Sequence, residues 1–290
     1  MHKRVLIVGA SGFLGSKMKD SLQTKASVLG TFNRNGFPDL THLDAASIEE
    51  VNHVFNHFRP HVVINAAGFT NVDQCEGMPE LAWRHNVEAV SNLARACANS
   101  GARFIQISTD HFDSPYLGSR PESCSPIAVN QYGFTKLMAE EIILKITSDT
   151  IILRTNFFGI GNRNSPSFLN WIRDSLMASK RITSVEDVFF TPIGVTELIE
   201  ILWDLIERDY EGVMNISGNE SISKLDFIRI AATVLHIDKP NLVPVRMADL
   251  NLKASRPLQM SLSNDEVCKF LKVQIPSVSS MLAQELGALN

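Results

Sequence analysis

Short apolar runs alternate with amphipathic stretches through the first half of the chain. The runs predict buried strands at Arg4–Val8, Ser27–Thr31, Val62–Asn65, Arg103–Ser108 and Thr150–Thr155. Apolar residues at helical spacing predict helices at Gly15–Leu22, Ile48–Phe58, Leu81–Ser100 and Val129–Lys145. Strands that alternate with helices favour a parallel sheet covered on both faces. The expected fold class is therefore α/β, with a doubly wound parallel sheet.

A glycine-rich loop follows the first predicted strand. Gly9, Gly12 and Gly15 are spaced by three residues and lead into a predicted helix. Glycine permits a tight turn and close approach of the backbone to a pyrophosphate, which the N-terminus of a helix also attracts. A Rossmann-type domain that binds NAD(P) is therefore expected. Its candidate loop residues are Gly9, Ser11, Gly12, Phe13, Leu14 and Gly15.

The end of the second predicted strand bears on the choice of cofactor. NAD-preferring sites commonly carry an acidic residue there, which accepts hydrogen bonds from the ribose 2′-hydroxyl. This chain carries Asn33 and Arg34 instead. Because arginine pairs well with phosphate, NADP(H) is the expected cofactor and NAD(H) the alternative. A second interpretation makes Arg34 an ordinary solvated surface residue.

The alternation of strands and helices loosens after Phe157. Residues 159–167 are rich in Gly, Asn, Ser and Pro, and the helices that follow are less regularly paired with strands. Those helices are predicted at Phe168–Ala178, Val195–Glu207 and Lys224–Leu235. We expect a nucleotide-binding domain of residues 1–158, to which residues 188–218 return. A smaller C-terminal substrate lobe would comprise residues 159–187 and 219–290.

Composition narrows the class of protein. The chain has 290 residues, 44% hydrophobic and 20% charged, as is typical of globular proteins. No apolar run reaches the roughly 18 residues that span a bilayer, so we expect no membrane partner and a cytoplasmic location. A net charge of −4 gives no electrostatic footprint for nucleic acid. The four cysteines lack metal-type spacing, and no metal is expected.

Tyr132 and Lys136 are the candidate catalytic pair. They are four residues apart on a predicted helix and therefore lie on one face. A nearby ammonium favours the phenolate and moves the tyrosine pKa towards the working pH. Tyr132 can then protonate a carbonyl oxygen while hydride reaches the carbon, and Thr109, after the fourth strand, can hold that oxygen. The chemistry indicated is that of an NAD(P)-dependent oxidoreductase.

The order of these motifs resembles that of extended short-chain dehydrogenases/reductases. Over nearly its whole length the chain most closely resembles the dTDP-4-dehydrorhamnose reductase family. The matching stretches are Gly9–Gly15, Asn65–Asp73, Asn86, Ser108–Asp110, Tyr132–Lys136, Arg154–Thr155 and Arg256–Pro257. The resemblance implies NADPH-dependent reduction of the 4-keto group of a nucleotide-linked 4-keto-6-deoxy sugar in deoxysugar biosynthesis.

The resemblance also implies roles for individual residues. Thr109 and Tyr132 would handle the ketone, and Lys136 would also bond the nicotinamide ribose. The further cofactor-binding candidates are Asp44, Ala45, Asn65, Ala66, Ala67, Asn86 and Ser108. The substrate-binding candidates are Val72, Asp73, Thr109, Asp110, His111, Phe157 and Arg256. Simpler interpretations are a helix cap for Asp73, core packing for Phe157 and a surface ion pair for Arg256.

Two departures from the family pattern leave the sugar open. After Asp110 the family usually continues Tyr-Val-Phe-Asp-Gly, whereas this chain reads His111-Phe-Asp-Ser. The segment Asp187–Pro192 lacks the glutamine and glycine that the family tends to carry. His111 beside Thr109 admits a second acid/base that epimerises the carbon next to the ketone, or a polar lining residue with no proton-transfer role.

Two rival functions remain at this level. One is a sugar-nucleotide epimerase with bound NAD, against which the lack of an acidic residue in Thr31–Arg34 argues. The other is a non-catalytic NADP-binding regulatory subunit, because the resemblance extends to the β subunit of methionine adenosyltransferase. Homodimers through the helices around 81–100 and 129–145 are usual in the superfamily, but no independent signal decides the oligomeric state.

Overall fold

The computed structural model describes residues 3–34, 36–114, 116, 118–163 and 165–287. Contacts group the chain into two compact units. The first unit comprises residues 1–108, 130–153 and 209–213, and the second comprises residues 109–129, 154–208 and 214–290. The predicted division into residues 1–158 with 188–218 and residues 159–187 with 219–290 stays a prediction.

A seven-stranded sheet with the order β11-β6-β5-β4-β1-β2-β3 organises the fold. Its strands are β1 (Arg4–Val8), β2 (Ser27–Phe32), β3 (Thr41–His42), β4 (Val62–Asn65), β5 (Arg103–Ile107), β6 (Thr150–Thr155) and β11 (Gly212–Ile216). The bonded pairs from β3 to β6 are all parallel. The strand order reverses between β1 and β4, which is the point where doubly wound sheets bind ligands. The predicted fold class is confirmed.

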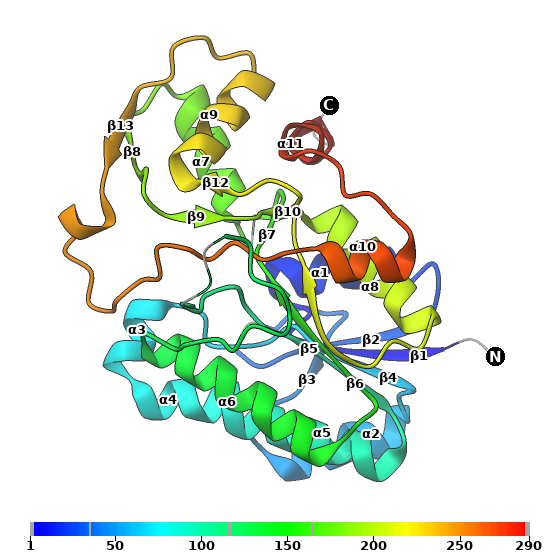
Figure 1. Cartoon of the computed structure of the whole chain (residues 1–290). Helices are drawn as coiled ribbons and strands as arrows, with labels where there is room; N and C mark the ends of the chain where they lie inside the picture. Colours follow the sequence, from blue (N-terminus) through cyan, green and yellow to red (C-terminus); the bar gives the residue numbers. More distant parts are fainter. Residues whose placement is uncertain (1–2, 35, 115, 117, 164, 288–290) are drawn as a thin grey trace. The chain divides into compact units, whose positions relative to one another are not determined.

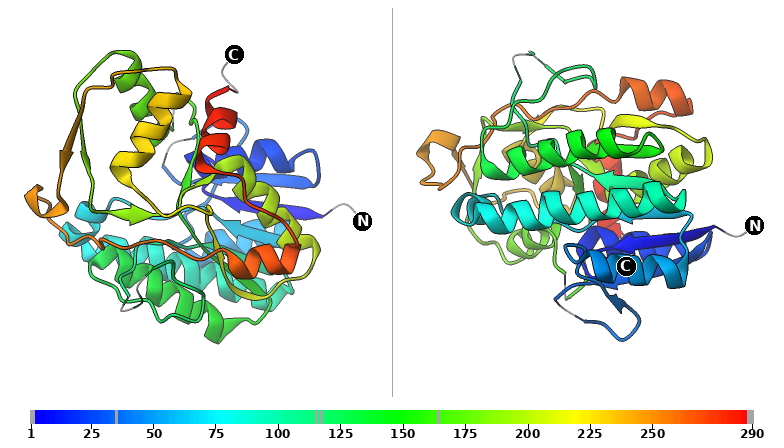
Figure 2. Two further views of the ribbon diagram at one scale, coloured as in Figure 1. Left: turned by 45° about the horizontal axis from the view of Figure 1, so that its top comes forward. Right: turned by 90° about the horizontal axis from the view of Figure 1, so that it is seen from below.

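Helices cover both faces of the sheet in the first unit (Figure 1). They are α1 (Phe13–Leu22), α2 (Ile48–Phe58), α3 (Val72–Gly77), α4 (Pro79–Trp83), α5 (Ala89–Ser100) and α6 (Gln131–Ile146). Helices α2, α5 and α6 lie side by side on one face, as the right-hand view of Figure 2 shows, and α1 lies on the other. A π-helical turn, Arg84–Glu88, joins α4 to α5.

Full burial of the strands explains why their sequences read as continuous apolar runs. In β1, Leu6 and Val8 pack with residues of α2, α5 and α6, including Val51, Leu93 and Ile143. Val5 and Ile7 alternate with them and are equally buried, because α1 covers the opposite face. A smaller cluster joins Cys75, Ala82 and Tyr132, with Phe69 and Val72 packed against it.

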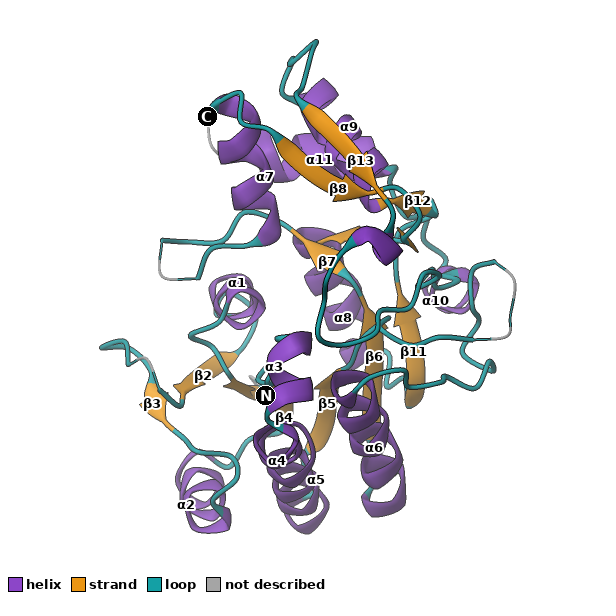
Figure 3. Cartoon of the chain, turned by 90° about the vertical axis from the view of Figure 1, so that its left-hand side faces the viewer, coloured by secondary structure: helices purple, strands orange, loops and turns teal. Residues whose placement is uncertain are grey.

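The second unit contains short strand pairs, five α-helices and the 3-10 helix Met247–Asp249 among its described residues. The strands are β7 (Phe157–Phe158), β8 (Ile182–Val185), β9 (Phe189–Phe190), β10 (Ile193–Gly194), β12 (Ile222–Ser223) and β13 (Leu242–Val245). The helices are α7 (Phe168–Met177), α8 (Val195–Glu207), α9 (Lys224–Val234), α10 (Asp265–Leu271) and α11 (Val278–Gly287). Figure 3 shows β8 and β13 side by side, and they pair in parallel.

The structure differs from the predicted elements at a few places. The helix predicted at Leu81–Ser100 begins at Pro79 and contains the π turn. Helix α6 begins at Gln131 rather than Val129, because the Asn130 side chain accepts a hydrogen bond from the Gly133 N–H at 2.8 Å and caps the helix there. None of the helices that the structure describes is long and apolar enough to cross a membrane.

The glycine loop yields a test of packing. A Cβ added at Gly15 would lie 2.3 Å from the Gly9 carbonyl oxygen, whereas at Gly12 the nearest atom would be 3.4 Å away. We therefore expect Gly15→Ala to lower the free energy of unfolding by about 1–3 kcal/mol. The matched Gly12→Ala variant should lose less than about 1 kcal/mol. Urea unfolding measures both, and equal losses would contradict this account of the loop.

Candidate cofactor and active site

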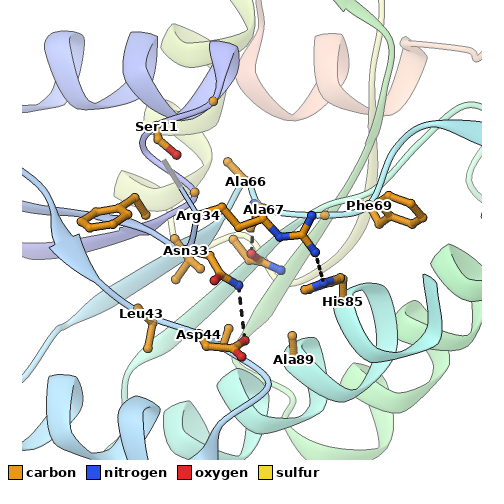
Figure 4. Close-up of a pocket in the computed structure, with 17 residues that line it drawn as sticks. Ser11, Asn33, Arg34, Leu43, Asp44, Ala66, Ala67, Phe69, His85 and Ala89 are labelled. Carbon is orange, nitrogen blue, oxygen red and sulfur yellow. Dashed lines mark hydrogen bonds between the residues drawn. The ribbon is translucent and has the colours of Figure 1, made fainter. Parts of the chain in front are cut away.

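A pocket of about 290 Å³ lies in the first unit, beyond the carboxyl ends of β1, β2 and β4 (Figure 4). This volume lies near the lower end of small-molecule pockets, roughly 300–1,000 Å³, and suits one part of a dinucleotide. Ten of the predicted cofactor residues line it: Gly9, Ser11, Gly12, Asn33, Arg34, Asp44, Ala45, Asn65, Ala66 and Ala67. The structure thus brings together residues at the ends of four strands, β1 to β4, that the sequence analysis selected separately.

Gly9 allows two of these loops to meet. Its φ is +84°, and a Cβ there would lie 2.8–2.9 Å from backbone and side-chain atoms of Ala67. Both facts require glycine. Gly12, at the N-cap of α1, has no side chain, and the first turn of α1 carries no acidic residue. That arrangement suits an anion at the helix N-terminus.

The loop after β4 is held by Asn65, which is buried. Its Nδ2 donates to Gln106 Oε1 at 2.9 Å, and its Oδ1 accepts from the Ala67 N–H at 3.1 Å. The first bond ties β4 to its neighbour β5, and the second closes the turn through Ala66. Asn65 therefore positions the Ala66–Ala67 backbone at the pocket wall.

The side chains of Asn33, Arg34, Asp44 and His85 lie near one another in the pocket, as Figure 4 shows. The Arg34 guanidinium contacts His85 Nε2 at 3.4 Å, and Asn33 Nδ2 lies 3.4 Å from Asp44 Oδ1. Asn33 and Arg34 are exposed, whereas His85 and Asp44 are half-buried. Among the described residues, Arg34 forms no ion pair with a carboxylate, and a cation in that setting can bind a phosphate.

Asp44 is already paired. Arg84 contacts Asp44 Oδ2 at 2.7 Å, and the Ala46 N–H donates to Oδ1 at 3.0 Å. Burial raises the pKa of Asp44, but the Ala46 N–H and the Arg84 charge outweigh it, so that the net pKa lies below the usual value. The carboxylate stays charged at neutral pH, with Arg84 as its counter-ion.

Asn86 and Ser108 serve positioning roles. Asn86 exchanges hydrogen bonds with the Phe69 backbone, at 2.8 Å to its N–H and 3.0 Å to its carbonyl, and also donates to Thr135 Oγ1 at 3.0 Å. It thereby connects the π turn to the β4 loop and to α6. Ser108 donates to Glu140 on α6. Their predicted contacts with cofactor stay predictions, as do those of Phe13, Leu14 and Gly15, which form the first turn of α1.

Tyr132 and Lys136 lie one turn apart on α6, and both are buried. Tyr132 packs among Cys75, Ala82 and Phe69. The Lys136 ammonium donates to the Ile107 carbonyl, at the end of β5, at 2.6 Å. Burial lowers the pKa of Lys136 to about 8, against the opposing charge of Glu140. The pair is thus held rigidly in the same unit as the dinucleotide pocket.

Thr109, Asp110 and His111 belong to the second unit, where the chain continues from Ser108. Thr109 Oγ1 accepts from the His111 N–H at 3.1 Å. Asp110 is buried and accepts from Asn156 Nδ2 at 2.7 Å. Burial raises the pKa of Asp110, although the charges of Lys224 and Arg120 oppose the shift. Asp110 is therefore held in place by Asn156, and its predicted contact with the substrate stays a prediction.

His111 is surrounded by positive charge. Burial first, and then Arg256, Lys224 and Arg120, lower its pKa to about 4. The imidazole is therefore neutral near pH 7, and it lacks the charged form that a general acid would need. This electrostatic setting favours the interpretation of His111 as a polar lining residue.

The other substrate candidates occupy varied settings. Val72 and Asp73 begin α3, whose N-cap is Asn71. Phe157 lies in β7, and Arg256 Nη1 donates to the Ala254 carbonyl at 2.8 Å. Their contacts with a substrate stay predictions. His85 and Phe69 line the pocket although the sequence analysis did not select them. In the sequence, the only indication that His85 lies near the cofactor is that it precedes Asn86, which was predicted to bind the cofactor.

Fold and site together define a class. A parallel sheet with the order found here, a glycine loop after β1 and a Tyr-x-x-x-Lys pair on the helix after β5 are the features of extended short-chain dehydrogenases/reductases. Residues 3–289 match the family model described as the RmlD substrate binding domain. The chain belongs to this family.

Relatives with curated names fall into two groups. A probable low-salt glycan biosynthesis reductase of Haloferax volcanii is 28% identical over 96% of this chain and 95% of its own length. The dTDP-4-dehydrorhamnose reductase of Mycobacterium tuberculosis is 28% identical over 90% and 85% of the two chains. Methionine adenosyltransferase 2 subunit beta of Rattus norvegicus is 28% identical over 88% and 78%.

Solved structures agree in fold. The dTDP-4-dehydrorhamnose reductase of Bacillus anthracis, in complex with NADP, has a TM-score of 0.90 and 26% identity, and covers 99% of this chain and 100% of its own. The orthologue from Clostridium acetobutylicum has a TM-score of 0.89 and 27% identity, with 99% of each chain covered. A UDP-glucose 4-epimerase of Thermus thermophilus, at 18% identity and a TM-score of 0.81, covers 98% of each chain and shares the fold.

The lowered pKa of Lys136 predicts a pH-dependent stability. An unfolded lysine titrates near 10.4, so above about pH 8 the unfolded chain binds more protons than the folded chain, and rising pH stabilises the fold. Relative to Lys136→Met, the wild type should gain stability between about pH 8 and 10, approaching about 1.4 kcal/mol per pH unit. Urea unfolding in matched buffers measures the difference.

Lys145→Met is the control for this measurement, because Lys145 is exposed on the same helix. The difference in the free energy of unfolding between Lys145→Met and the wild type should be the same at every pH from about 8 to 10. A pH-independent difference for Lys136→Met as well would mean that the ammonium is not desolvated in the folded protein.

Proposed function

We propose that this protein reduces the 4-keto group of a nucleotide-linked 4-keto-6-deoxy sugar with NADPH, as a step in deoxysugar biosynthesis. The observation that carries the proposal is the placement of Tyr132 and Lys136. Both are buried on α6, with the Lys136 ammonium anchored at the end of β5, in the unit that contains the dinucleotide pocket. The family and its reductase members support the same chemistry.

The residues of this chain divide the work between binding and proton transfer. The Gly9–Gly12 loop and the N-terminus of α1 would hold the pyrophosphate, and Asn33 with Arg34 the adenosine ribose. NADPH, when bound, supplies a hydride to the sugar carbonyl carbon. Tyr132 donates its hydroxyl proton to the carbonyl oxygen, and Thr109 donates a hydrogen bond to the same oxygen. Lys136 stabilises the resulting phenolate by its charge.

NADP(H) is the preferred cofactor in this proposal, and NAD(H) the alternative. Arg34 lines the pocket two residues after the end of β2. Asn33 and Arg34 stand where NAD-preferring proteins commonly carry an acidic residue. The Bacillus anthracis reductase was solved with NADP, whereas more distant neighbours hold NAD. We also infer a cytoplasmic protein that does not act on nucleic acid. Exposed apolar side chains on α6, Phe134 and Leu144, support a homodimer through that helix.

A second candidate is a regulatory subunit that binds NADP without turnover. It is favoured by the alignment with methionine adenosyltransferase 2 subunit beta at an identity equal to that of the reductase from Mycobacterium tuberculosis. The buried Tyr132 and Lys136 argue for catalysis. A protein that only binds NADP does not need a tyrosine proton donor with a buried lysine one helical turn away.

The deciding experiment is NADPH oxidation at about 340 nm with a panel of dTDP-, GDP- and UDP-linked 4-keto-6-deoxy sugars. Turnover of one sugar would establish the reductase and name its substrate class. NADPH binding without turnover across the panel would favour the regulatory subunit.

Tyr132→Phe is the matched test of proton donation within this assay. The variant keeps the ring in its apolar cluster and removes only the hydroxyl. We expect kcat to fall by at least about a hundredfold while the dissociation constant for NADPH changes little. Activity within a few-fold of the wild type would exclude Tyr132 as the acid.

Arg34→Ala tests cofactor preference. Loss of the guanidinium removes a partner for the 2′-phosphate, so the dissociation constant for NADPH should rise by roughly tenfold or more while that for NADH barely changes. Fluorescence titration of each cofactor measures this. Equal weakening of both would show that Arg34 supports the pocket instead of recognising the phosphate.

A further inference from the structure

We propose that His85 is a second ligand for the 2′-phosphate of NADP, and that it forms with Arg34 a two-sided anion clamp that takes up a proton when the cofactor binds. The inference rests on the proposed preference for NADP and adds to it a residue, a charge state and a pH dependence. His85 comes from the π turn and Arg34 from the end of β2, so two elements far apart in sequence meet at one end of the pocket (Figure 4).

The contact between the two side chains bears on the protonation state of His85. Arg34 Nη2 and His85 Nε2 are 3.4 Å apart. Because a guanidinium only donates, a hydrogen bond at this contact requires the form of His85 that has no proton on Nε2. A phosphate oxygen that contacts both groups would accept a hydrogen bond from each, with Nε2 newly protonated. The two side chains would then donate to one anion from two sides.

The charges around His85 agree with this assignment. Arg34 approaches it from the β2 end, Asp44 from the segment after β3, and Arg84 from its own turn. Burial first, and then the charge of Arg34, lower the pKa of His85, while Asp44 opposes them. Asp44 is paired with Arg84 at 2.7 Å, and no ion pair joins Arg34 to a carboxylate among the described residues, so a bound anion can balance the Arg34 charge. A phosphate monoester carries about −1.5 to −2 charges near pH 7, which matches one arginine and one protonated histidine.

The backbone supports the same placement. A π turn interrupts the helix between α4 and α5 at Arg84–Glu88, and such single turns inside helices are frequent at functional sites. Asn86, within the turn, is bonded to Phe69 and Thr135. These bonds hold the turn at the pocket wall, with the Phe69 and His85 rings 6.4 Å apart. His85 is therefore positioned by neighbours that do not depend on a ligand.

Proton uptake makes the affinity for NADPH depend on pH, which would not follow if His85 only packed against the cofactor. Bound phosphate raises the pKa of His85 above its ligand-free value. Affinity for NADPH should therefore fall as pH rises from the ligand-free pKa to the higher pKa of the complex, by up to about tenfold per pH unit. NADH, which lacks the phosphate, should show no such dependence. The second pKa of the phosphate itself lies near about 6, so measurements belong above that value.

The experiment measures dissociation constants for NADPH and NADH by fluorescence titration between about pH 6.5 and 8.5, with no sugar present. His85→Gln should weaken NADPH binding by roughly tenfold at the lower pH and much less at the higher, leaving NADH unchanged. His85→Lys should retain NADPH affinity and lose its pH dependence. His57→Gln, an exposed histidine of α2 outside the pocket, is the matched control and should behave as the wild type.

The outcomes separate this inference from the proposed function. If His85→Gln leaves the ratio of the NADPH and NADH constants unchanged at every pH, the clamp is wrong while the NADP preference stands. If the wild type has equal dissociation constants for NADPH and NADH, both the clamp and the NADP preference are wrong. Failure to turn over any keto sugar would overturn the reductase proposal alone, because cofactor binding is measured without a substrate.

Discussion

The close approach of Gly9 to Ala67 is the constraint on which the cofactor end of the molecule depends. Any side chain at Gly9 would overlap Ala67, and the positive φ of Gly9 excludes most other residues as well. Asn65 fixes the other side of this contact by closing the turn through Ala66 and by bonding β5. This part of the pocket wall is thus shaped by backbone atoms, whereas the side chains of Asn33, Arg34 and His85 line another part.

Charge is distributed unequally around this rigid frame. Lys136 is buried at a cost in desolvation and is tied to the Ile107 carbonyl, which keeps the ammonium in place for chemistry. Arg34 is exposed at the other end, where solvent screens it. In the proposed function, the cation that acts on the reacting group is thus fixed in place, whereas the cation that distinguishes NADPH from NADH is accessible from solvent.

The sequence predicted the central sheet well because its strands are buried on both faces and read as uninterrupted apolar runs. It did not predict α3, β11 or the short strands of the second unit, since elements of so few residues carry too little periodicity. The position of Arg34 after β2 followed from the order of elements. His85 did not, because its approach to the pocket depends on a π turn and on the bonds of Asn86, and neither leaves a signature in the sequence.

The π turn also changes the phase of the helix that contains it. Each α-helical residue advances the side-chain direction by about 100°, and a π turn interrupts that count. Ala82, before the turn, packs with Cys75 and Tyr132, whereas Leu93 and Cys97, after it, pack in the core beneath the sheet. One helical run therefore contributes to two groups of packed residues, and the π turn with His85 lies between the segments that supply them.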